Sequence, residues 1–169
     1  MQLEGPEPPA APRRGPRMAV EDLSVYEMHG GHTLHKHVGV GPEEALRRVR
    51  DGEPAAGSFT DRRTAQLAID DAIQAHRHAI AGWLWGPNAR ARYAFVESLR
   101  RVVGTSLTRH DVARGVSAPS PATAVRVVLQ PTDDLPAGFS VLTAYPTRAR
   151  TRTHRAHAPR LRHTEGVPA

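Results

Sequence analysis

Residues 60–84 read TDRRTAQLAIDDAIQAHRHAIAGWL, and the apolar side chains in this stretch recur at steps of three and four residues. This period puts them on one face of an α-helix. Thr60 or Asp61 is a suitable N-cap, because its side-chain oxygen can accept a hydrogen bond from an unpaired N–H of the first turn. Gly86 and Pro87 follow and stop the helix. The stretch therefore predicts one long amphipathic helix.

Downstream of this helix the pattern becomes typical of β-strands. Residues 124–130 and 139–145 are rich in β-branched and aromatic side chains. The loop between them contains proline, aspartate and glycine, so the two runs predict an antiparallel hairpin. Residues 102–107 are expected to add a shorter strand.

Further helices are expected on both sides of the long one. Pro42 and the two glutamates after it are typical of a first helical turn, where the missing proline N–H is harmless and acidic groups favour the positive end of the dipole. A helix that begins past the long one would bury Tyr93, Val96 and Leu99. Helices that precede strands favour an α+β fold, with N-terminal helices packed on an antiparallel β-sheet, over alternating βαβ units. The three additional helices are expected at 18–27, 42–50 and 89–101.

The size and composition indicate one globular domain. A chain of 169 residues with 39% hydrophobic positions can build one core but hardly two. No apolar run approaches the roughly 18 to 20 residues of a membrane span, and no signal-peptide pattern begins the chain. The absence of cysteine excludes disulfides, thiolate catalysis and Cys-ligated metals. We expect a disordered proline-rich leader or linker at 1–17, the domain at 18–146 and a disordered basic tail at 147–169.

The positive charge of the chain lies mostly outside the predicted domain. The net charge is +6, yet residues 18–145 contain 14 basic and 14 acidic residues, whereas the tail carries six arginines against Glu165 alone. The charge of the domain itself therefore gives little support for a polyanionic partner.

The sequence HGGHTLHKH at residues 29–37 holds four of the ten histidines. These side chains have three interpretations: solvated loop residues, two or three ligands of a metal ion, or a general acid or base. The metal interpretation lacks an HExxH helix. The acid–base interpretation needs a cation near the substrate, and Arg48 is a candidate because a guanidinium fork matches phosphate geometry. All three interpretations stay open at this point.

Two hydroxyl side chains on the last predicted strand are further candidates. Thr143 and Tyr145 are two residues apart, so they project from the same face of a regular strand and could hold a phosphoryl oxygen together. The simpler interpretation is one packed face that also includes Phe139 and Val141, with Tyr145 in the core. Packing is likewise the first interpretation for the aromatic and small side chains Ser58, Phe59, Trp83 and Trp85.

Taken in order, several of these motifs resemble one family. The chain resembles the bacterial RNase A-like toxin domain found at the C-terminus of CdiA-type contact-dependent growth inhibition proteins and other polymorphic toxins. The resemblance covers about Leu23 to Pro146. One departure is Gly57, which stands where the family has a small hydroxyl residue. The motifs are EMHGGHTLHKHVG at 27–39, LRRV at 46–49, AGSF at 56–59 and FSVLTAYP at 139–146.

The resemblance implies a metal-independent RNA endonuclease, a hydrolase with no cofactor and an RNase A-like α+β fold without disulfides. The family's active-site His, Arg, Thr and Tyr fall on His37, Arg48, Thr143 and Tyr145, and His32 is a second candidate in the same loop. His37 would transfer the proton of the RNA 2′-OH, which then attacks phosphorus and leaves a 2′,3′-cyclic phosphate. Arg48, Thr143 and Tyr145 would stabilise the charge on the phosphate oxygens.

The resemblance also implies partners and a site of action. The substrate would be tRNA or another single-stranded RNA, and a cognate immunity protein would hold the toxin inactive in its producer. The protein would be a secreted or delivered effector that acts in the cytoplasm of the target cell, without contacting a membrane. The alternative is a non-enzymatic metal-binding or RNA-binding module that uses the His-rich loop and the basic tail.

Overall fold

The computed structural model describes residues 16–149, so most of the predicted leader and most of the predicted tail lie outside the described residues. None of the helices in the described part is long and apolar enough to cross a bilayer. The helices are α1 Leu23–Met28, α2 Thr33–His37, α3 Pro42–Arg50, α4 Arg62–Leu84 and α5 Arg109–Ala113. The strands are β1 Ala55–Phe59, β2 Tyr93–Ser98, β3 Gly104–Thr108, β4 Ser120–Ala122, β5 Ala124–Pro131 and β6 Phe139–Thr147.

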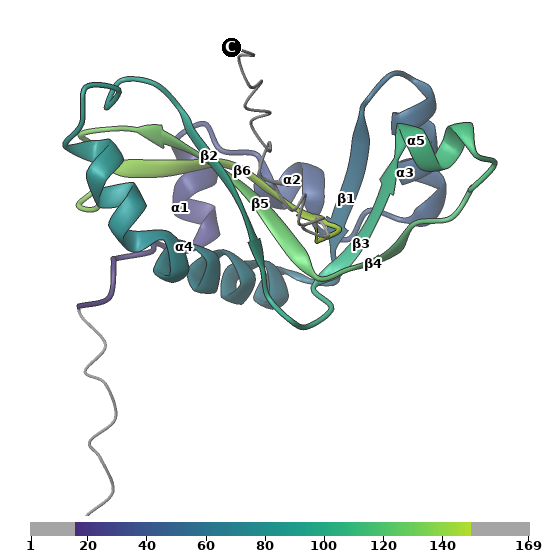
Figure 1. The fold of residues 1–169 in the computed structure, drawn as a ribbon, viewed down its shortest axis with the longest axis horizontal. Helices are drawn as coiled ribbons and strands as arrows, with labels where there is room; N and C mark the ends of the chain where they lie inside the picture. Colours follow the sequence, from purple (N-terminus) through teal and green to yellow (C-terminus); the bar gives the residue numbers. More distant parts are fainter. Residues whose placement is uncertain (1–15, 150–169) are drawn as a thin grey trace, which may run out of the picture.

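The strands form two antiparallel sheets, in the orders β1-β3-β4 and β2-β5-β6. Figure 1 shows the sheets diverging as the two arms of a V, with α4 along one arm and α3 and α5 on the other. Helix α2 lies where the arms meet and contacts both β6 and β1. The predicted α+β fold with antiparallel sheets and no disulfides is confirmed.

Helix α4 supplies the largest share of the core. Its N-cap is Asp61, whose carboxylate accepts a 2.7 Å hydrogen bond from the Thr64 N–H. One face of the helix packs against β2 and β5, as its period predicts. The hairpin of β5 and β6 and the helix at Pro42–Arg50 are also confirmed. The buried residues of α4 are Ala65, Ala68, Ile69, Ala72, Ile73, Ile80 and Trp83.

The helix predicted over 89–101 is wrong, because residues 93–98 form strand β2 instead. The rings of Tyr93 and Phe95 lie 5.7 Å apart in a tilted arrangement and turn toward the core, whereas Val96 is 37% exposed. Tyr93, Val96 and Leu99 follow one another at three-residue steps, which favours a helix, but pairing with β5 over the whole of β2 makes this segment a strand.

Trp85 was also interpreted wrongly as a packing residue, since it is 91% exposed. It is the C-cap of α4, past the last turn that the sheet covers. Its neighbour Trp83 is buried, and its indole N–H donates to the Ala91 carbonyl. Trp85 lines a surface hollow of about 1030 Å³, together with Leu84 and Pro131, at the end of α4.

A β-bulge in β6 changes which side chains face the core. Val128 pairs with Thr143 and Leu129 pairs with Val141, so Leu142 is an extra residue on β6. Before the bulge Val141 faces the core, and after it Ala144 does. Thr143 is therefore on the opposite face from Val141, and the single packed face proposed for this strand is wrong.

Candidate active site

The Gly-Gly-His-Thr motif attaches α2 to the bulged part of β6. A Cβ at Gly31 would lie 2.7 Å from the Val141 carbonyl oxygen, so only glycine allows this close approach. The His32 N–H donates to the Leu142 carbonyl at 3.0 Å, and the Ala144 N–H donates to the Thr33 hydroxyl at 2.9 Å. The free edge of β6 is thus paired with the start of the histidine-bearing helix.

Strand β1 fixes the other end of α2 and orients His37. Val38, the C-cap of α2, forms an isolated bridge with Phe59, and His37 Nδ1 lies 3.1 Å from the Gly57 carbonyl oxygen. A carbonyl can only accept, so Nδ1 carries the hydrogen in the neutral ring. The lone pair of that imidazole is therefore on Nε2, which is the atom left free to accept a proton.

Two of the other candidate side chains, His32 and Tyr145, lie beside the His37 ring. The ring centroids of His37 and Tyr145 are 5.2 Å apart, and those of His32 and His37 are 6.4 Å apart. Tyr145 follows Ala144, whose side chain is in the core, so its ring is on the face of β6 turned away from the core. The fold thus brings the start and the end of the domain to one imidazole.

The pKa values of His32 and His37 are both lowered in the free protein. Burial lowers the pKa of His37 to about 4, the Gly57 hydrogen bond opposes this shift, and the charges of His32, Arg48 and Lys36 add to it. Burial is also the first cause that lowers the pKa of His32, followed by the charge of Lys36. His37 is therefore neutral near pH 7, the form in which Nε2 can take up a proton.

Arg48 reaches the site from α3. Its Nη1 donates to the Lys36 carbonyl at 2.7 Å, which ties it to the last turn of α2 next to His37. Its Nε donates to a Glu44 carboxylate oxygen at 2.8 Å, and the side chain is 21% exposed. Hydrogen bonds from Arg47 first and Arg48 second hold the pKa of Glu44 at about 2. No hydrogen bond within residues 16–149 uses Nη2 of Arg48, so this group can still donate to a ligand.

Thr143 lies on the same strand as Tyr145, two residues earlier and past the bulge. Its hydroxyl is buried and has no hydrogen-bond partner among the described residues. An unpaired buried hydroxyl is unusual in a folded protein, and Ser140 on the same strand has one too.

The other histidines of the loop do not join this cluster. His29 Nδ1 contacts the Val25 carbonyl at 2.8 Å at the end of α1, and His35 is exposed. Within residues 16–149 no three His, Asp or Glu side chains come close enough together to hold a metal ion. The structure thus separates the histidines into a pair, His32 and His37, and two that lie elsewhere.

Sequence reasoning missed the residues that hold the cluster in place. Glu44 was interpreted only as a helix-start charge, Thr33 was not singled out, and Gly57 was noted only as a departure. The signals for them are contacts between distant segments, such as the bond from Ala144 to Thr33 across 111 residues. Arg92, whose charge also lowers the pKa of His32, was missed for the same reason.

Gly57→Ala is expected to lower the free energy of unfolding by about 1 to 3 kcal/mol and to reduce activity. A Cβ at Gly57 would overlap the Pro146 carbonyl, so β1 or β6 must shift, and with it the bond that orients His37. Chemical denaturation measures the stability change. The matched control is Gly82→Ala in α4, where nothing lies within 4 Å and about 0.5 to 1 kcal/mol of stabilisation is expected. Equal stability of Gly57→Ala and wild type would contradict the close approach.

Comparison with known proteins shows the family of this chain. Residues 31–146 match the family model described as the bacterial CdiA-CT RNAse A domain. The crystal structure of the CdiA-CT/CdiI complex from Y. kristensenii 33638 contains a chain that is 30% identical, with a TM-score of 0.61. The match covers 69% of this chain and 99% of that one. A search of curated protein sequences finds no match.

Proposed function

The chain belongs to the bacterial CdiA-CT RNase A domain family, a family of ribonuclease toxin domains, and from this premise we propose that it is a metal-independent RNA endonuclease. The observation that carries the proposal is the neutral, oriented imidazole of His37 beside the Tyr145 ring and the Arg48 guanidinium. This set offers a base and several hydrogen-bond donors around one point, as cleavage of a phosphodiester requires.

The reaction begins with His37. Its Nε2 takes the proton of the RNA 2′-OH, and the oxygen attacks the adjacent phosphorus. The bond from phosphorus to the 5′-oxygen breaks, which yields a 2′,3′-cyclic phosphate and a free 5′-OH. DNA lacks the attacking hydroxyl and is not a substrate.

Three groups stabilise the negative charge that builds on the nonbridging oxygens. Arg48 donates through Nη2 while its other nitrogens stay bound to Glu44 and the Lys36 carbonyl. Tyr145 donates through its phenol. Thr143 donates through the hydroxyl that has no partner in the described part of the chain, after a χ1 rotation brings it to the exposed side. Arg48 is already held by its other bonds and costs little reorganisation when charge develops, whereas Thr143 must first rotate.

The leaving 5′-oxygen needs a proton, and His32 and Tyr145 are the side chains beside His37 that can donate one. The lowered pKa of His32 means that it must gain its proton in the complex, where the negative phosphate favours the imidazolium. The assignment is tested below with an activated substrate.

The relative of known structure is a CdiA-CT in complex with a CdiI protein. By analogy, a cognate immunity protein binds this chain and holds it inactive in the producing cell. The domain is delivered into a target cell and acts on RNA in its cytoplasm.

We expect the purified protein to cleave tRNA or single-stranded RNA in the presence of EDTA and to leave 2′,3′-cyclic phosphate ends. Mass spectrometry of the products identifies these ends, and a DNA strand of the same sequence serves as the control. RNA that stays intact in EDTA and is cleaved when zinc is added would contradict the mechanism and favour a metal site at the histidines.

A further inference from the structure

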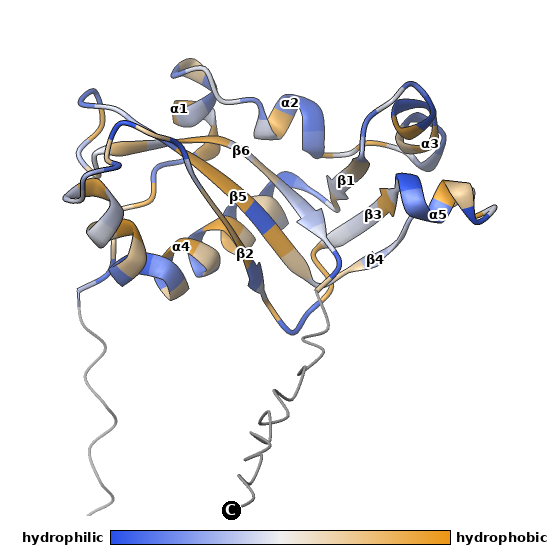
Figure 2. Cartoon of the chain, turned by 45° about the horizontal axis from the view of Figure 1, so that its top comes forward, coloured by the Kyte–Doolittle hydropathy of each residue, from blue (hydrophilic) through white to orange (hydrophobic). Residues whose placement is uncertain are grey.

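On the face of the sheet β2-β5-β6 that α4 leaves uncovered, α2 packs at β6, where His37 lies beside Tyr145. Helix α4 covers the face that carries Val125 and Val127. The opposite face carries Arg126 on β5 and the exposed side chains of Ala94 and Val96 on β2. Figure 2 shows β5 as a mostly hydrophobic strand with one hydrophilic band, and Arg126 is the charged residue of that strand.

The strand register connects this face to the candidate active site. Arg126 pairs with Val96 on one side and with Tyr145 on the other. Side chains directly opposite each other in an antiparallel pair have Cβ atoms about 4.5 to 5.5 Å apart. The Tyr145 ring lies 5.2 Å from that of His37. A row of neighbouring side chains therefore extends from Val96 through Arg126 and Tyr145 to His37.

The positive charge of Arg126 is not neutralised by its surroundings. No ion pair or side-chain hydrogen bond to Arg126 is present within residues 16–149, whereas Arg47 and Arg101 each pair with a carboxylate. The acidic residue of β2, Glu97, lies on the α4 side, where it binds His76 Nε2 at 3.0 Å. Arg126 is half-buried on this face, and a guanidinium with no carboxylate partner in the described part of the chain can bind an anion.

We propose that this face is an RNA subsite, in which Arg126 binds the phosphodiester next to the cleaved one and the apolar side chains Ala94, Val96 and Val128 contact the attached nucleoside. The subsite rests on the proposed nuclease function. Arg126 lies one strand beyond Tyr145 from His37, about 4.8 Å farther. The two substrates compared below distinguish binding of the neighbouring phosphate from binding of the cleaved one.

The test compares Arg126→Gln with wild type on two substrates. On an RNA oligonucleotide, kcat/KM is expected to fall by about 10-fold or more, the usual loss for a charged hydrogen bond. On a dinucleotide, whose single phosphodiester is the one cleaved, it is expected to stay unchanged. For a 2′-O-methyl RNA oligonucleotide, which binds but lacks the attacking hydroxyl, the slope of log affinity against log salt should become shallower by about 0.7. Arg126→Lys keeps the charge and should restore that slope.

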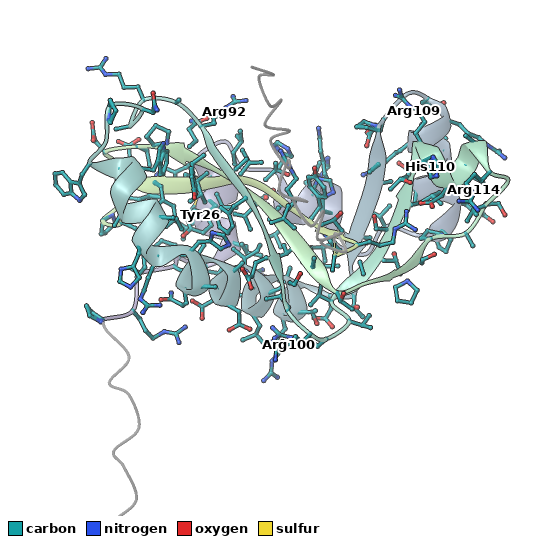
Figure 3. All side chains as sticks on the ribbon, viewed as in Figure 1. Tyr26, Arg92, Arg100, Arg109, His110 and Arg114 are labelled. Atoms are coloured by element: carbon teal, nitrogen blue, oxygen red, sulfur yellow. The ribbon has the colours of Figure 1, made fainter. Side chains whose placement is uncertain are left out.

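The matched control is Arg100→Gln, which removes the same charge elsewhere. Arg100 is exposed and points to the opposite side of the molecule from Arg92, the arginine near His32 (Figure 3). The subsite proposal is wrong if Arg126→Gln loses the same kcat/KM on both substrates or loses none on either. It is also wrong if Arg100→Gln shows the same loss. If wild type cleaves neither substrate, the nuclease proposal fails. Binding of the 2′-O-methyl oligonucleotide then still decides the subsite, since affinity lost in Arg126→Gln alone supports it.

Discussion

His37→Ala is expected to lower kcat on RNA by about 10²- to 10⁴-fold, the contribution typical of a positioned general base. The variant removes the only group in the cluster whose free nitrogen, Nε2, is both neutral and oriented by a bond on its other nitrogen. A cleavage assay on an RNA oligonucleotide, quenched at successive time points, measures the loss of kcat. His29→Ala is the control, because that ring contacts the Val25 carbonyl away from the site, and it should keep full activity.

The thermal melt of His37→Ala should resemble that of wild type, so that the loss reflects chemistry and not unfolding. Full activity of His37→Ala together with a large loss in His32→Ala would show that the two histidines of the loop are assigned the wrong way round.

The pH dependence follows from the same ring. With the pKa of His37 at about 4 in the free protein, kcat/KM should fall only as the pH drops below about 4. Bound RNA places a negative phosphate beside the imidazolium and raises its pKa, so the acid limb of kcat should lie at higher pH.

The free energy of unfolding also depends on pH through His37. Between pH 6.5 and about 4 the unfolded chain binds the His37 proton and the folded chain does not, so the free energy of unfolding falls as pH falls through this window.

Tyr145→Phe is expected to lower kcat by about 10²- to 10³-fold, as loss of one preorganised donor does. The variant keeps the ring that lies 5.2 Å from His37 and removes only the hydroxyl, so the fold and the position of His37 are preserved. The matched control is Tyr93→Phe, which makes the same change in a ring that packs against Phe95 in the core.

A second substrate separates the two roles open to Tyr145. A nucleoside 3′-(4-nitrophenyl phosphate) releases a phenolate that needs no proton. If Tyr145 stabilises the nonbridging oxygens, Tyr145→Phe loses activity on this substrate as well as on RNA, which is the result we expect. A loss confined to RNA would instead make Tyr145 the leaving-group acid, and the same pair of substrates identifies His32 in that role through His32→Gln.

The local elements of the fold were largely predictable. The helices at Pro42–Arg50 and Arg62–Leu84 and the hairpin of β5 and β6 follow from side-chain period, first-turn chemistry and turn composition, which act within a few residues. The short helix α2 could not be predicted from such local patterns. Helix α2 has five residues and no side-chain cap, and it forms because β6 and β1 hold its two ends.

The identity of the candidate residues was also available in the sequence, through the motifs that resemble a family. The spatial arrangement of these residues was not available in the sequence, and the interpretation of the last strand as one packed face placed Tyr145 in the core. A register shift at Leu142 is invisible in the residue pattern, because it depends on which residues of β5 form the partner strand. The shift turns Thr143 and Tyr145 away from the core, and the Tyr145 ring then lies beside His37.

The sequence by itself determined which chemical groups this protein has, where its longest helix and its hairpin form, and that its core holds together without disulfides. These properties depend on composition and on neighbours close along the chain. The tertiary structure alone decided that His37 meets Tyr145, that burial lowers the pKa of His37, and that Arg126 continues the row across the sheet. Each of these depends on contacts between segments far apart in sequence, which no local pattern encodes.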